Sequence, residues 1–369
     1  MSYVVKGWCP GALRPMMSGD GLVVRVRPRM ARLTAEQAQG LAKAALTHGN
    51  GLIDLTARAN LQLRGIRPET HLALLDDLTL LGLIDEDETV ESRRNIVVSP
   101  FWVAGDATQQ AVDVVSAVLA APEFAGLPGK FGVAVDSVPA VLQAISADIR
   151  IERMDGAWLV RPDGFATGVV VRDVAGALRR LLIWFLSVGV KDGRGRMAGL
   201  SGYDLPAGFD QPMTKTKYEA CPGAHVLGQT VGFEFGQMRA ETLLSLASCA
   251  MRITPWRMIL LEGVKMIPAI AGVITDGQDP RLRVSACTGA PGCPQGLQPT
   301  RDLARRLASS VPQGRHLHVS GCAKGCAHPK PADVTLTGAA HGFGVIRDGC
   351  AADRPSGMLT SETILFKAL

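Results

Sequence analysis

The chain has 369 residues, and at about 150 residues per domain this length predicts two or three units. Apolar residues make up 47% and charged residues 20%, which excludes a disordered chain. Aromatic residues are only 5% and the net charge is only +5, which excludes a DNA-coating protein and favours an acidic small molecule as the partner. No apolar run could cross a bilayer and no signal peptide pattern is visible, so we expect a cytoplasmic protein with neither membrane nor nucleic acid as partner.

The first half of the chain alternates between strands and helices. We expect, in order, a strand at 21–27, a helix from a Thr34/Gln37 capping box to about 46, strands at 51–55 and 60–66, and a helix at 68–81. This order is typical of a ferredoxin-like half domain, which we place with an N-terminal arm at 1–88. A first α/β half at 89–190 follows, with strands at 94–99, 130–136 and within 146–172, and helices at 107–120 and 174–188.

The same pattern returns after a segment rich in glycine, proline and charge at 191–228, which we interpret as a linker. A strand at 230–235 and a helix at 240–250 precede ITPWRMILLEGV (253–264), which echoes LTARANLQLRGI (55–66). Thr254 and Gly263 match Thr56 and Gly65 at one offset of 198 residues. We therefore predict a duplicated α+β architecture, with a second ferredoxin-like half at 229–278 and a second α/β half at 279–369.

Four of the eight cysteines form two close pairs, Cys287-x5-Cys293 and Cys322-x3-Cys326. Two thiolate pairs on loops can converge on one centre, and soft thiolates favour zinc or an iron–sulfur cluster. The five-residue spacing fits structural zinc poorly, and its small residues, TGAPG, would let the backbone wrap around a bulky [4Fe-4S] cubane. Zinc and unrelated buried cysteines are the alternatives that spacing alone leaves open.

Beyond the spacing, the cysteine pattern with Ser320-Gly321 before the second pair resembles the sirohaem/[4Fe-4S] nitrite and sulfite reductase superfamily. Three further segments resemble that superfamily in the same order: Thr56-x-Arg58-x-Asn60-Leu61-Gln62-Leu63-Arg64-Gly65, Arg94-Asn95-Ile96-Val97 and Leu127-Pro128-Gly129-Lys130-Phe131. The resemblance covers most of the chain. It implies a duplicated nitrite/sulfite reductase-like architecture, in which two ferredoxin-like halves are flanked by two α/β cluster-binding halves.

Other segments resemble one branch of this superfamily, the precorrin-3B synthases. These segments are Gly7-Trp8-Cys9-Pro10-Gly11-Ala12, the following Ser18-Gly19-Asp20-Gly21-Leu22, and Arg252-x-Thr254-Pro255-Trp256-Arg257. Gly132 stands where the anion reductases carry a second lysine that clamps sulfite or nitrite, which weakens the case for anion reduction and is expected to enlarge the cavity. The resemblance implies an oxygen-dependent monooxygenase that hydroxylates C20 of precorrin-3A and closes a γ-lactone. A sirohaem-dependent nitrite or sulfite reductase is the alternative, and an electron-transfer scaffold is a third.

The substrate of this branch carries eight carboxylates, which calls for cationic side chains on rigid strands. Arg25, Arg27 and Arg29 alternate along one expected strand, and Arg58, Asn60, Gln62 and Arg64 along another, so that each set shares a face. A solvated sheet face is the alternative interpretation. The expected substrate-binding residues are Arg25, Arg27, Arg58, Asn60, Gln62, Arg64, Arg94, Asn95 and Lys130. The expected metal ligands are Cys287, Cys293, Cys322 and Cys326.

The cofactors follow from the same resemblance. It implies a [4Fe-4S] cluster and a second, mononuclear non-haem iron whose ligands are not readable in the sequence, whereas sirohaem is less favoured. The expected partners are precorrin-3A and O2, an external electron donor that is either an NADH-linked reductase or a ferredoxin, and a ring-contracting methyltransferase that receives the product. Cys9 stands apart from Cys221, Cys249 and Cys350, because it lies in the segment typical of the branch.

Overall fold

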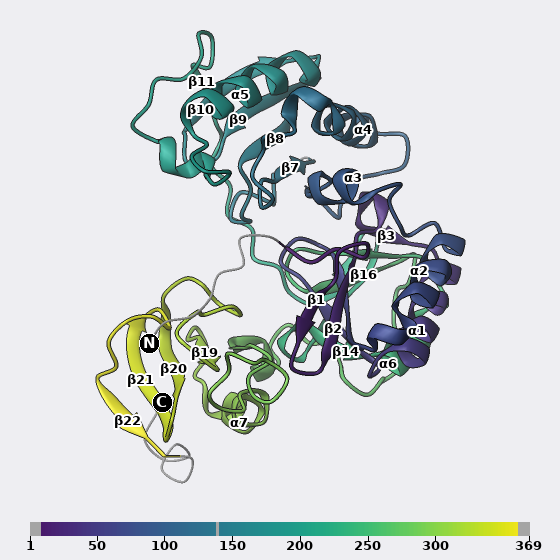
Figure 1. The fold of residues 1–369 in the computed structure, drawn as a ribbon, viewed down its shortest axis with the longest axis vertical. Coiled ribbons are helices and arrows are strands. Elements are labelled where there is room, and N and C mark those ends of the chain that lie inside the picture. The colour runs from purple at the N-terminus through teal and green to yellow at the C-terminus, as the bar shows by residue number, and fades with distance from the viewer. Residues whose placement is uncertain (1–8, 138–139, 361–369) are drawn as a thin grey trace.

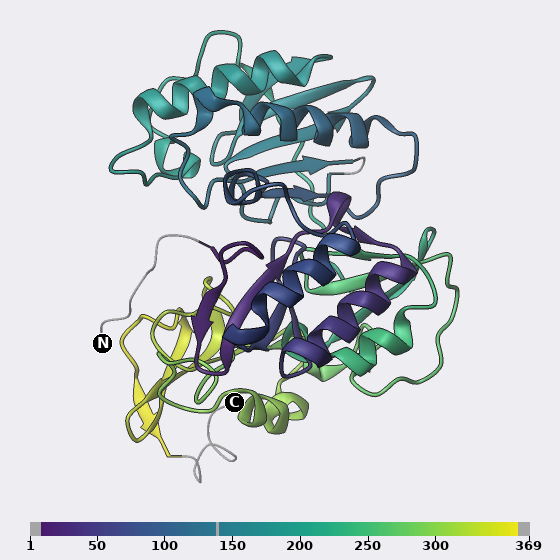
Figure 2. The ribbon, with the colours of Figure 1, turned by 45° about the vertical axis from the view of Figure 1, so that its right-hand side comes forward.

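The computed structural model describes residues 9–137 and 140–360, and it contains four β-sheets. Two of them form the ferredoxin-like centre of the molecule, and the other two belong to α/β units on either side (Figures 1 and 2). The first two residues of the Gly7–Ala12 segment lie outside the described residues. None of the helices in the described part of the chain combines the length and apolar character needed to cross a membrane.

The first central sheet has the strand order β1 (Met16–Ser18), β2 (Gly21–Val26), β5 (Leu61–Ile66), β4 (Leu52–Leu55) and β14 (Gln237–Arg239). The second has the order β12 (Gly223–His225), β13 (Gly228–Phe233), β16 (Met258–Glu262), β15 (Met251–Ile253) and β3 (Arg32–Leu33), with β17 (Val273–Ile274) paired to β13. Each sheet thus takes its last strand from the other half of the chain. This exchange explains why the two halves share one continuous hydrophobic core.

The helices of this central unit are α1 (Ala35–His48), α2 (His71–Leu80) and α6 (Ala240–Leu246). The expected capping box at Thr34 and Gln37 is present, with both reciprocal hydrogen bonds formed. Short 3-10 turns, η1 (Arg29–Ala31), η2 (Pro68–Thr70) and η5 (Glu234–Gly236), connect the strands to the helices.

The duplication is visible in the backbone of two turns, which lie at equivalent positions 198 residues apart in the sequence. Ala59 in the turn between β4 and β5 has φ 54°, and Arg257 in the turn between β15 and β16 has φ 59°. The hydroxyl of Thr56 accepts a hydrogen bond from the Asn60 amide, and that of Thr254 accepts one from the Met258 amide. Both turns therefore have a residue in the left-handed region at the same position and the same threonine hydroxyl hydrogen bond, as expected for two copies of one ancestral unit.

The α/β units have related topologies. The sheet of the first unit has the strand order β6 (Ile96–Val98), β7 (Val133–Asp136), β8 (Ile149–Met154), β9 (Ala157–Pro162), β10 (Thr167–Val171) and β11 (Gln211–Pro212). The helices of this unit are α3 (Glu88–Arg93), α4 (Ala107–Ala120) and α5 (Val174–Val188). In the second, the order is β18 (Val284–Ala286), β19 (Leu317–Ser320), β20 (Ala332–Ala339), β21 (Gly342–Gly349) and β22 (Gly357–Leu359), with α7 (Arg301–Leu307). The first three strands are parallel in both units, and the later pairings are antiparallel.

The remaining 3-10 turns are η3 (Pro122–Phe124), η4 (Met197–Leu200), η6 (Pro280–Arg283) and η7 (Ala308–Ser310). Within the segment 191–228, which we interpreted as a linker, Met197 and Phe209 are buried in the core of the first α/β unit. Strand β11 from the same segment pairs with β10. Much of this segment is therefore packed against the first α/β unit.

Two of the strand boundaries that differ from the sequence prediction bear on the expected rows of polar side chains. Strand β2 ends at Val26, so that Arg27 lies just beyond it and Arg29 lies in η1. Strand β5 begins at Leu61, so that Arg58 and Asn60 belong to the preceding turn. The hydroxyl of Thr56, which accepts hydrogen bonds from the amides of both residues, draws the backbone into that turn. The side chains of each expected row consequently do not share one face.

Candidate active site

The paired cysteines lie on two loops at the carboxyl ends of neighbouring parallel strands. Cys287 directly follows β18, and Cys322 follows β19 after Gly321. Proteins with α/β sheets commonly bind their ligands next to the carboxyl ends of the strands, because the connecting loops diverge there and leave a crevice. The pairing of β18 with β19 thus brings the two cysteine loops together.

Glycines let these loops pack backbone against backbone. The amide of Gly321 donates a hydrogen bond to the Sγ atom of Cys287 at 3.1 Å, and its carbonyl accepts one from Leu297 at 2.8 Å. A Cβ atom at Gly321 would lie 3.0 Å from the Cα of Gly289 and 3.3 Å from that of Gly296. The sequence TGAPG between the first two cysteines is therefore small because the second loop presses against it.

The first half of the chain also holds the cysteine loop. The carbonyl of Gly292 accepts hydrogen bonds from the Gly19 amide at 3.2 Å, the Ser18 hydroxyl at 2.8 Å and the Arg64 guanidinium at 3.3 Å. Asp20 fixes that guanidinium in an ion pair of 2.7 Å. The β1–β2 hairpin of one half is therefore docked on the cysteine loop of the other.

The four paired thiols lie close enough to interact electrostatically. Burial raises the pKa of the Cys326 thiol, and charge on Cys287, Cys322 and Cys293 raises it further, against an opposing effect of Lys324. In a [4Fe-4S] cluster each of four cysteines binds a different iron atom, and this donor set, with an amide hydrogen bond to one sulfur, fits such a group. Among the described residues no group of three or more His, Cys, Asp or Glu side chains is arranged to hold a single metal ion, so the structure identifies no ligands for a second iron.

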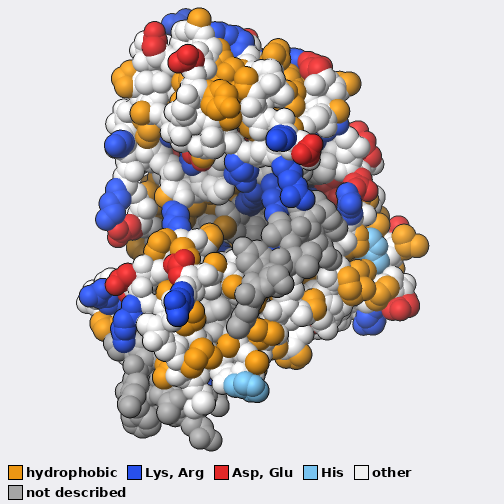
Figure 3. Space-filling view, turned by 60° about the vertical axis from the view of Figure 1, so that its left-hand side comes forward, with side chains coloured by type: hydrophobic (Ala, Val, Ile, Leu, Met, Phe, Trp, Pro, Cys, Tyr) orange, Lys and Arg blue, Asp and Glu red, His pale blue; other side chains and the backbone are white. Residues whose placement is uncertain are grey.

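A cleft of about 730 Å³ lies beside the cysteine loops, where Cys287 and Cys326 form part of its wall. We call it the cationic cleft, because six cationic side chains line it: Arg25, Arg58, Lys130, Arg196, Arg257 and Arg301. Figure 3 shows Lys and Arg side chains gathered around the hollow between the first α/β unit, at the top, and the rest of the molecule.

Most of these cations are not neutralised. Among the described carboxylates, Asp54 forms an ion pair of 3.3 Å with Arg301, and Asp148 forms one of 2.9 Å with Arg196. The guanidinium of Arg25 donates to Gln62, and that of Arg58 donates to the carbonyl of Lys130. Burial lowers the pKa of Arg58 and of Arg257 below the ordinary arginine value. These charges are incompletely compensated, so an anionic ligand would stabilise them.

The nine expected substrate-binding residues separate into three groups. Arg25, Arg58, Gln62 and Lys130 line the cationic cleft. Arg64 lies with Cys293 in an adjoining cavity of about 260 Å³, where it is held by Asp20. The other four residues lie away from the cleft, and they are Arg27, Asn60, Arg94 and Asn95.

The two arginines of this last group are held by neighbouring carboxylates. Arg94 forms two hydrogen bonds with the carboxylate of Asp85, at 2.8 and 2.9 Å, and donates to the carbonyl of Arg27. Arg27 is paired with buried Glu91 at 2.9 Å. These local ion pairs keep both guanidinium groups out of the cleft, and the sequence pattern alone does not reveal them.

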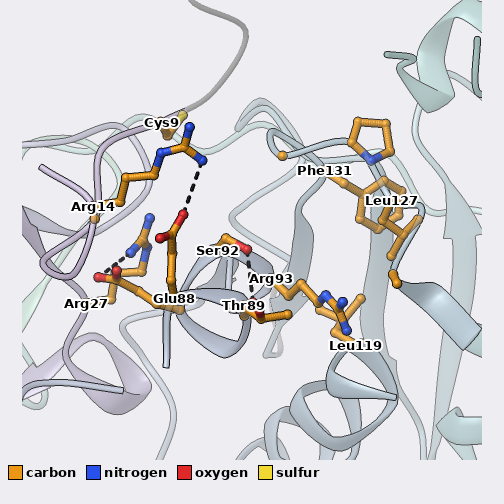
Figure 4. A pocket seen from close by; sticks show the side chains of 15 residues that line it. Cys9, Arg14, Arg27, Glu88, Thr89, Ser92, Arg93, Leu119, Leu127 and Phe131 are labelled. Atoms are coloured by element: carbon orange, nitrogen blue, oxygen red, sulfur yellow. Dashed lines mark hydrogen bonds and ion pairs between the residues drawn. The ribbon is translucent and has the colours of Figure 1, made fainter. Parts of the chain in front are cut away.

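The N-terminal arm places Cys9 at the edge of the cleft. Cys9 lines both the cationic cleft and a side pocket of about 490 Å³, in which it, Arg14 and Arg27 lie on one side and Leu127 and Phe131 on the other (Figure 4). Burial would raise the pKa of the Cys9 thiol, but Arg25, Arg58 and Lys130 outweigh it and the pKa is lowered. The arm thus presents a thiol with increased anionic character.

Buried Glu91 fixes this arm from α3. Its carboxylate accepts hydrogen bonds from the amides of Ala12 and Leu13, besides pairing with Arg27. A Cβ atom at Gly11 would lie 2.1 Å from the carboxylate of Glu91, so a larger residue there would have to displace that carboxylate. The Cys9-Pro10-Gly11-Ala12 motif is therefore explained by its docking on Glu91.

Sequence analysis missed three cationic residues of the cleft: Arg196, Arg257 and Arg301. Arg257 is in the segment typical of the branch, so its motif carried a signal. Arg196 comes from the segment expected to be a linker, and Arg301 begins α7, so neither was marked by a strand pattern. Their proximity depends on the packing of three separate units.

Gly132 does not line the cleft. Its amide donates to Asp148, its carbonyl accepts from the amide of Asp148, and a Cβ atom there would lie 2.7 Å from the side-chain nitrogen of Asn95. The expectation that this glycine enlarges the cavity is therefore not supported, because the residue directly precedes β7 and is enclosed between Asn95 and Asp148.

Comparisons with known proteins agree with this arrangement. Residues 14–81 match the family model of the nitrite/sulfite reductase ferredoxin-like half domain. The NirA protein of Mycobacterium tuberculosis superimposes with a TM-score of 0.65 over 93% of this chain and 79% of its own, at 17% identity. The ferredoxin–nitrite reductase of Synechococcus elongatus is 25% identical over 88% of this chain and 78% of its own. The fold is that of the nitrite/sulfite reductases, as predicted.

Within that class, a precorrin-3B synthase from Sinorhizobium sp. is 31% identical over 99% of this chain and 87% of its own length. The chain belongs to the precorrin-3B synthase family, which confirms the resemblance drawn from the motifs and makes this an oxidoreductase-like enzyme.

Proposed function

We propose that this protein is the oxygen-dependent monooxygenase of cobalamin biosynthesis that converts precorrin-3A to precorrin-3B by C20 hydroxylation and γ-lactone formation. The observation that carries the proposal is the cationic cleft beside the cysteine pairs. A macrocycle with eight carboxylates suits a cleft in which cations outnumber carboxylates, since guanidinium groups bind carboxylates through paired hydrogen bonds. The relative's name, precorrin-3B synthase, supports the same substrate.

In this proposal, residues from three units hold the substrate. Arg25 and Arg58 come from the first ferredoxin-like half, Arg257 from the second, and Arg301 from the second α/β unit. Because these side chains lie on separate elements, they can bind carboxylates at several points around the edge of the precorrin macrocycle. One face of the macrocycle would then be directed toward Cys287 and Cys326. The four paired cysteines would hold a [4Fe-4S] cluster, which transfers one electron at a time when bound.

A sirohaem-dependent nitrite or sulfite reductase is the second candidate, supported by the relative from Synechococcus elongatus. The pairing of Arg94 with Asp85 argues against it. Arg94 lies in a segment that resembles the superfamily and matches one of its cationic positions, and here its charge is already compensated.

The test uses anaerobically purified full-length protein whose iron and acid-labile sulfide have been counted. Incubation with precorrin-3A, a reductant and ¹⁸O-labelled oxygen should add one labelled oxygen at C20, detected by mass spectrometry. Arg257→Gln and Arg301→Gln should weaken precorrin-3A binding by about tenfold or more each, because each removes a charge-assisted hydrogen bond of about 1.5–3 kcal/mol. Arg153→Gln, on β8 and outside the cleft lining, is the matched control and should bind normally. A bound sirohaem chromophore with nitrite or sulfite turnover and no labelled product would contradict the proposal.

A further inference from the structure

A buried carboxylate connects the segment 191–228 to one end of the cationic cleft. Asp148 directly precedes β8, and its side chain is 1% exposed. Its Oδ1 atom accepts hydrogen bonds from the Nε of Arg196 at 2.9 Å and from the Met197 amide at 3.0 Å. Its Oδ2 atom accepts one from the Gly132 amide at 3.0 Å. Both carboxylate oxygens are therefore engaged by the protein, and Asp148 does not itself line the cleft.

The guanidinium of Arg196 is held on one side only. Its Nε atom donates to Asp148, while its Nη2 atom donates to the Ser146 hydroxyl at 3.1 Å and to the carbonyl of Ala147 at 3.2 Å. Its Nη1 atom forms no hydrogen bond with a described residue, and the side chain is 39% exposed in the wall of the cationic cleft. A long flexible side chain is thereby fixed in one orientation, with one amino group left for a ligand.

The same carboxylate acts on two further cations through the backbone. Gly132, whose amide it accepts, lies two residues after Lys130, and the carbonyl of Lys130 accepts a hydrogen bond from the Arg58 guanidinium at 3.1 Å. Burial lowers the pKa of Arg58, and the positive charges of Arg25 and Arg196 lower it further. Arg58 and Arg196 are thus close enough to repel each other, and a carboxylate between them would be attracted by both.

We propose that Asp148 is a positioning residue for substrate binding, which fixes Arg196 so that its free Nη1 atom, together with Arg58, binds one carboxylate of the macrocycle. This inference rests on the function proposed above. Burial raises the pKa of Asp148, and Arg196 and the two backbone amides oppose this shift, so that the carboxylate and the guanidinium stabilise each other's charge. Removing either partner should therefore disturb the same contact with the substrate.

The test measures the binding of uroporphyrin III, a fluorescent macrocycle with eight carboxylates, by fluorescence anisotropy with the full-length, cluster-containing protein. Arg196→Gln should weaken binding about tenfold, the effect of losing one hydrogen bond to a charged group. Asp148→Asn should weaken binding by about the same factor. The double variant should bind no more weakly than either single variant, because both substitutions remove one contact, whereas two independent sites would give a loss of about a hundredfold.

Glu152→Gln is the matched control for the loss of a buried carboxylate in the same unit. Glu152 lies on β8, is 5% exposed and pairs with Arg161 at 2.7 Å, and neither residue lines the cationic cleft. This variant should lower the free energy of unfolding in urea but bind uroporphyrin III normally. It therefore separates a positioning role of Asp148 from a general loss of stability in the first α/β unit.

Arg196→Lys keeps the test valid even if Asp148→Asn does not fold, because this side chain is partly exposed. A lysine ammonium lacks the planar fork that contacts Asp148 and a ligand at the same time, so binding should fall about as much as in Arg196→Gln. With precorrin-3A, Asp148→Asn should raise KM and leave kcat unchanged, since a contact to a peripheral carboxylate is the same before and during the reaction.

Normal uroporphyrin III binding by Asp148→Asn or by Arg196→Lys would overturn the positioning role. So would additive losses in the double variant, or a loss in Glu152→Gln that equals the loss in Asp148→Asn. Absence of binding to the unaltered protein would contradict the macrocycle site itself, and with it the proposed function. The expected binding pattern without labelled product from precorrin-3A would support the positioning role and reject only the proposed reaction.

Discussion

The docking of the N-terminal arm on Glu91 gives the sharpest prediction of stability. Glu91→Gln keeps the shape of the side chain but removes its charge and places an NH2 group where the structure needs an acceptor. Glu91 is 4% exposed and interacts with two backbone amides and the guanidinium of Arg27. The substitution therefore leaves a buried guanidinium without its counter-charge and one amide without an acceptor.

The expected loss of unfolding free energy is about 3–5 kcal/mol, the typical cost of removing one partner of a buried ion pair. A hydrogen bond to a charged group contributes about 1.5–3 kcal/mol, so the one amide that loses its acceptor accounts for part of this loss and the uncompensated guanidinium for the rest. Glu88→Gln is the control on the same helix. Its ion pair with Arg14 is about half exposed, with side-chain exposures of 54% and 55%, and an exposed pair contributes less than about 1 kcal/mol.

The assay is urea denaturation followed by circular dichroism, together with the rate at which iodoacetamide alkylates Cys9, measured by mass spectrometry. Glu91→Gln should lower the denaturation midpoint and speed alkylation, because the released arm exposes Cys9. Adding Arg27→Met to Glu91→Gln should restore part of the loss, since the uncompensated charge is then absent. If Glu91→Gln behaves like Glu88→Gln in both measurements, the arm is not held by this carboxylate and the reasoning is refuted.

Three further predictions concern the cluster and the first α/β unit. Serine at any one of the four paired cysteines should lower the bound iron and sulfide and bleach the visible absorption. Cys249→Ser is the control and should retain the iron, the sulfide and the absorption. Normal iron in all four variants would reject the ligand set. Gly321→Ala should also reduce iron content, because its Cβ would meet the opposing loop at 3.0 Å, while Gly202→Ala, with open space around it, should not; equal iron in the two would disprove the packing argument. Burial raises the pKa of Asp136 to about 7 from 3.8, so the folded protein retains a proton that the unfolded chain releases, and stability should fall as the pH rises from about 4 to 7. Asp136→Asn should flatten this part of the stability profile in urea titrations at a series of pH values, and an unchanged profile would exclude Asp136 as its source.

Local patterns in the sequence determined the elements and the thiol pairs. The capping box at Thr34 and Gln37 and helices 107–120 and 174–188 depend on neighbouring residues, and the structure contains them as predicted. The offset of 198 residues between Thr56 and Thr254 predicted the duplication, because both turns need the same backbone geometry. The cysteine spacing with its small residues predicted two loops that converge. This prediction was possible because both loops follow neighbouring strands of a single sheet.

Only the tertiary structure decided which cations face the cleft. Arg25 and Arg27 are two residues apart, yet one lines the cleft and the other is turned aside by Glu91, a partner 64 residues away. Arg196 and Arg301 joined the site from elements without a recognisable motif. The exchange of β3 and β14 between the two sheets was likewise invisible, because such pairings depend on contacts between distant segments. Alternation along a strand specifies a face, but the ion pairs and packing of the folded chain determine what that face meets.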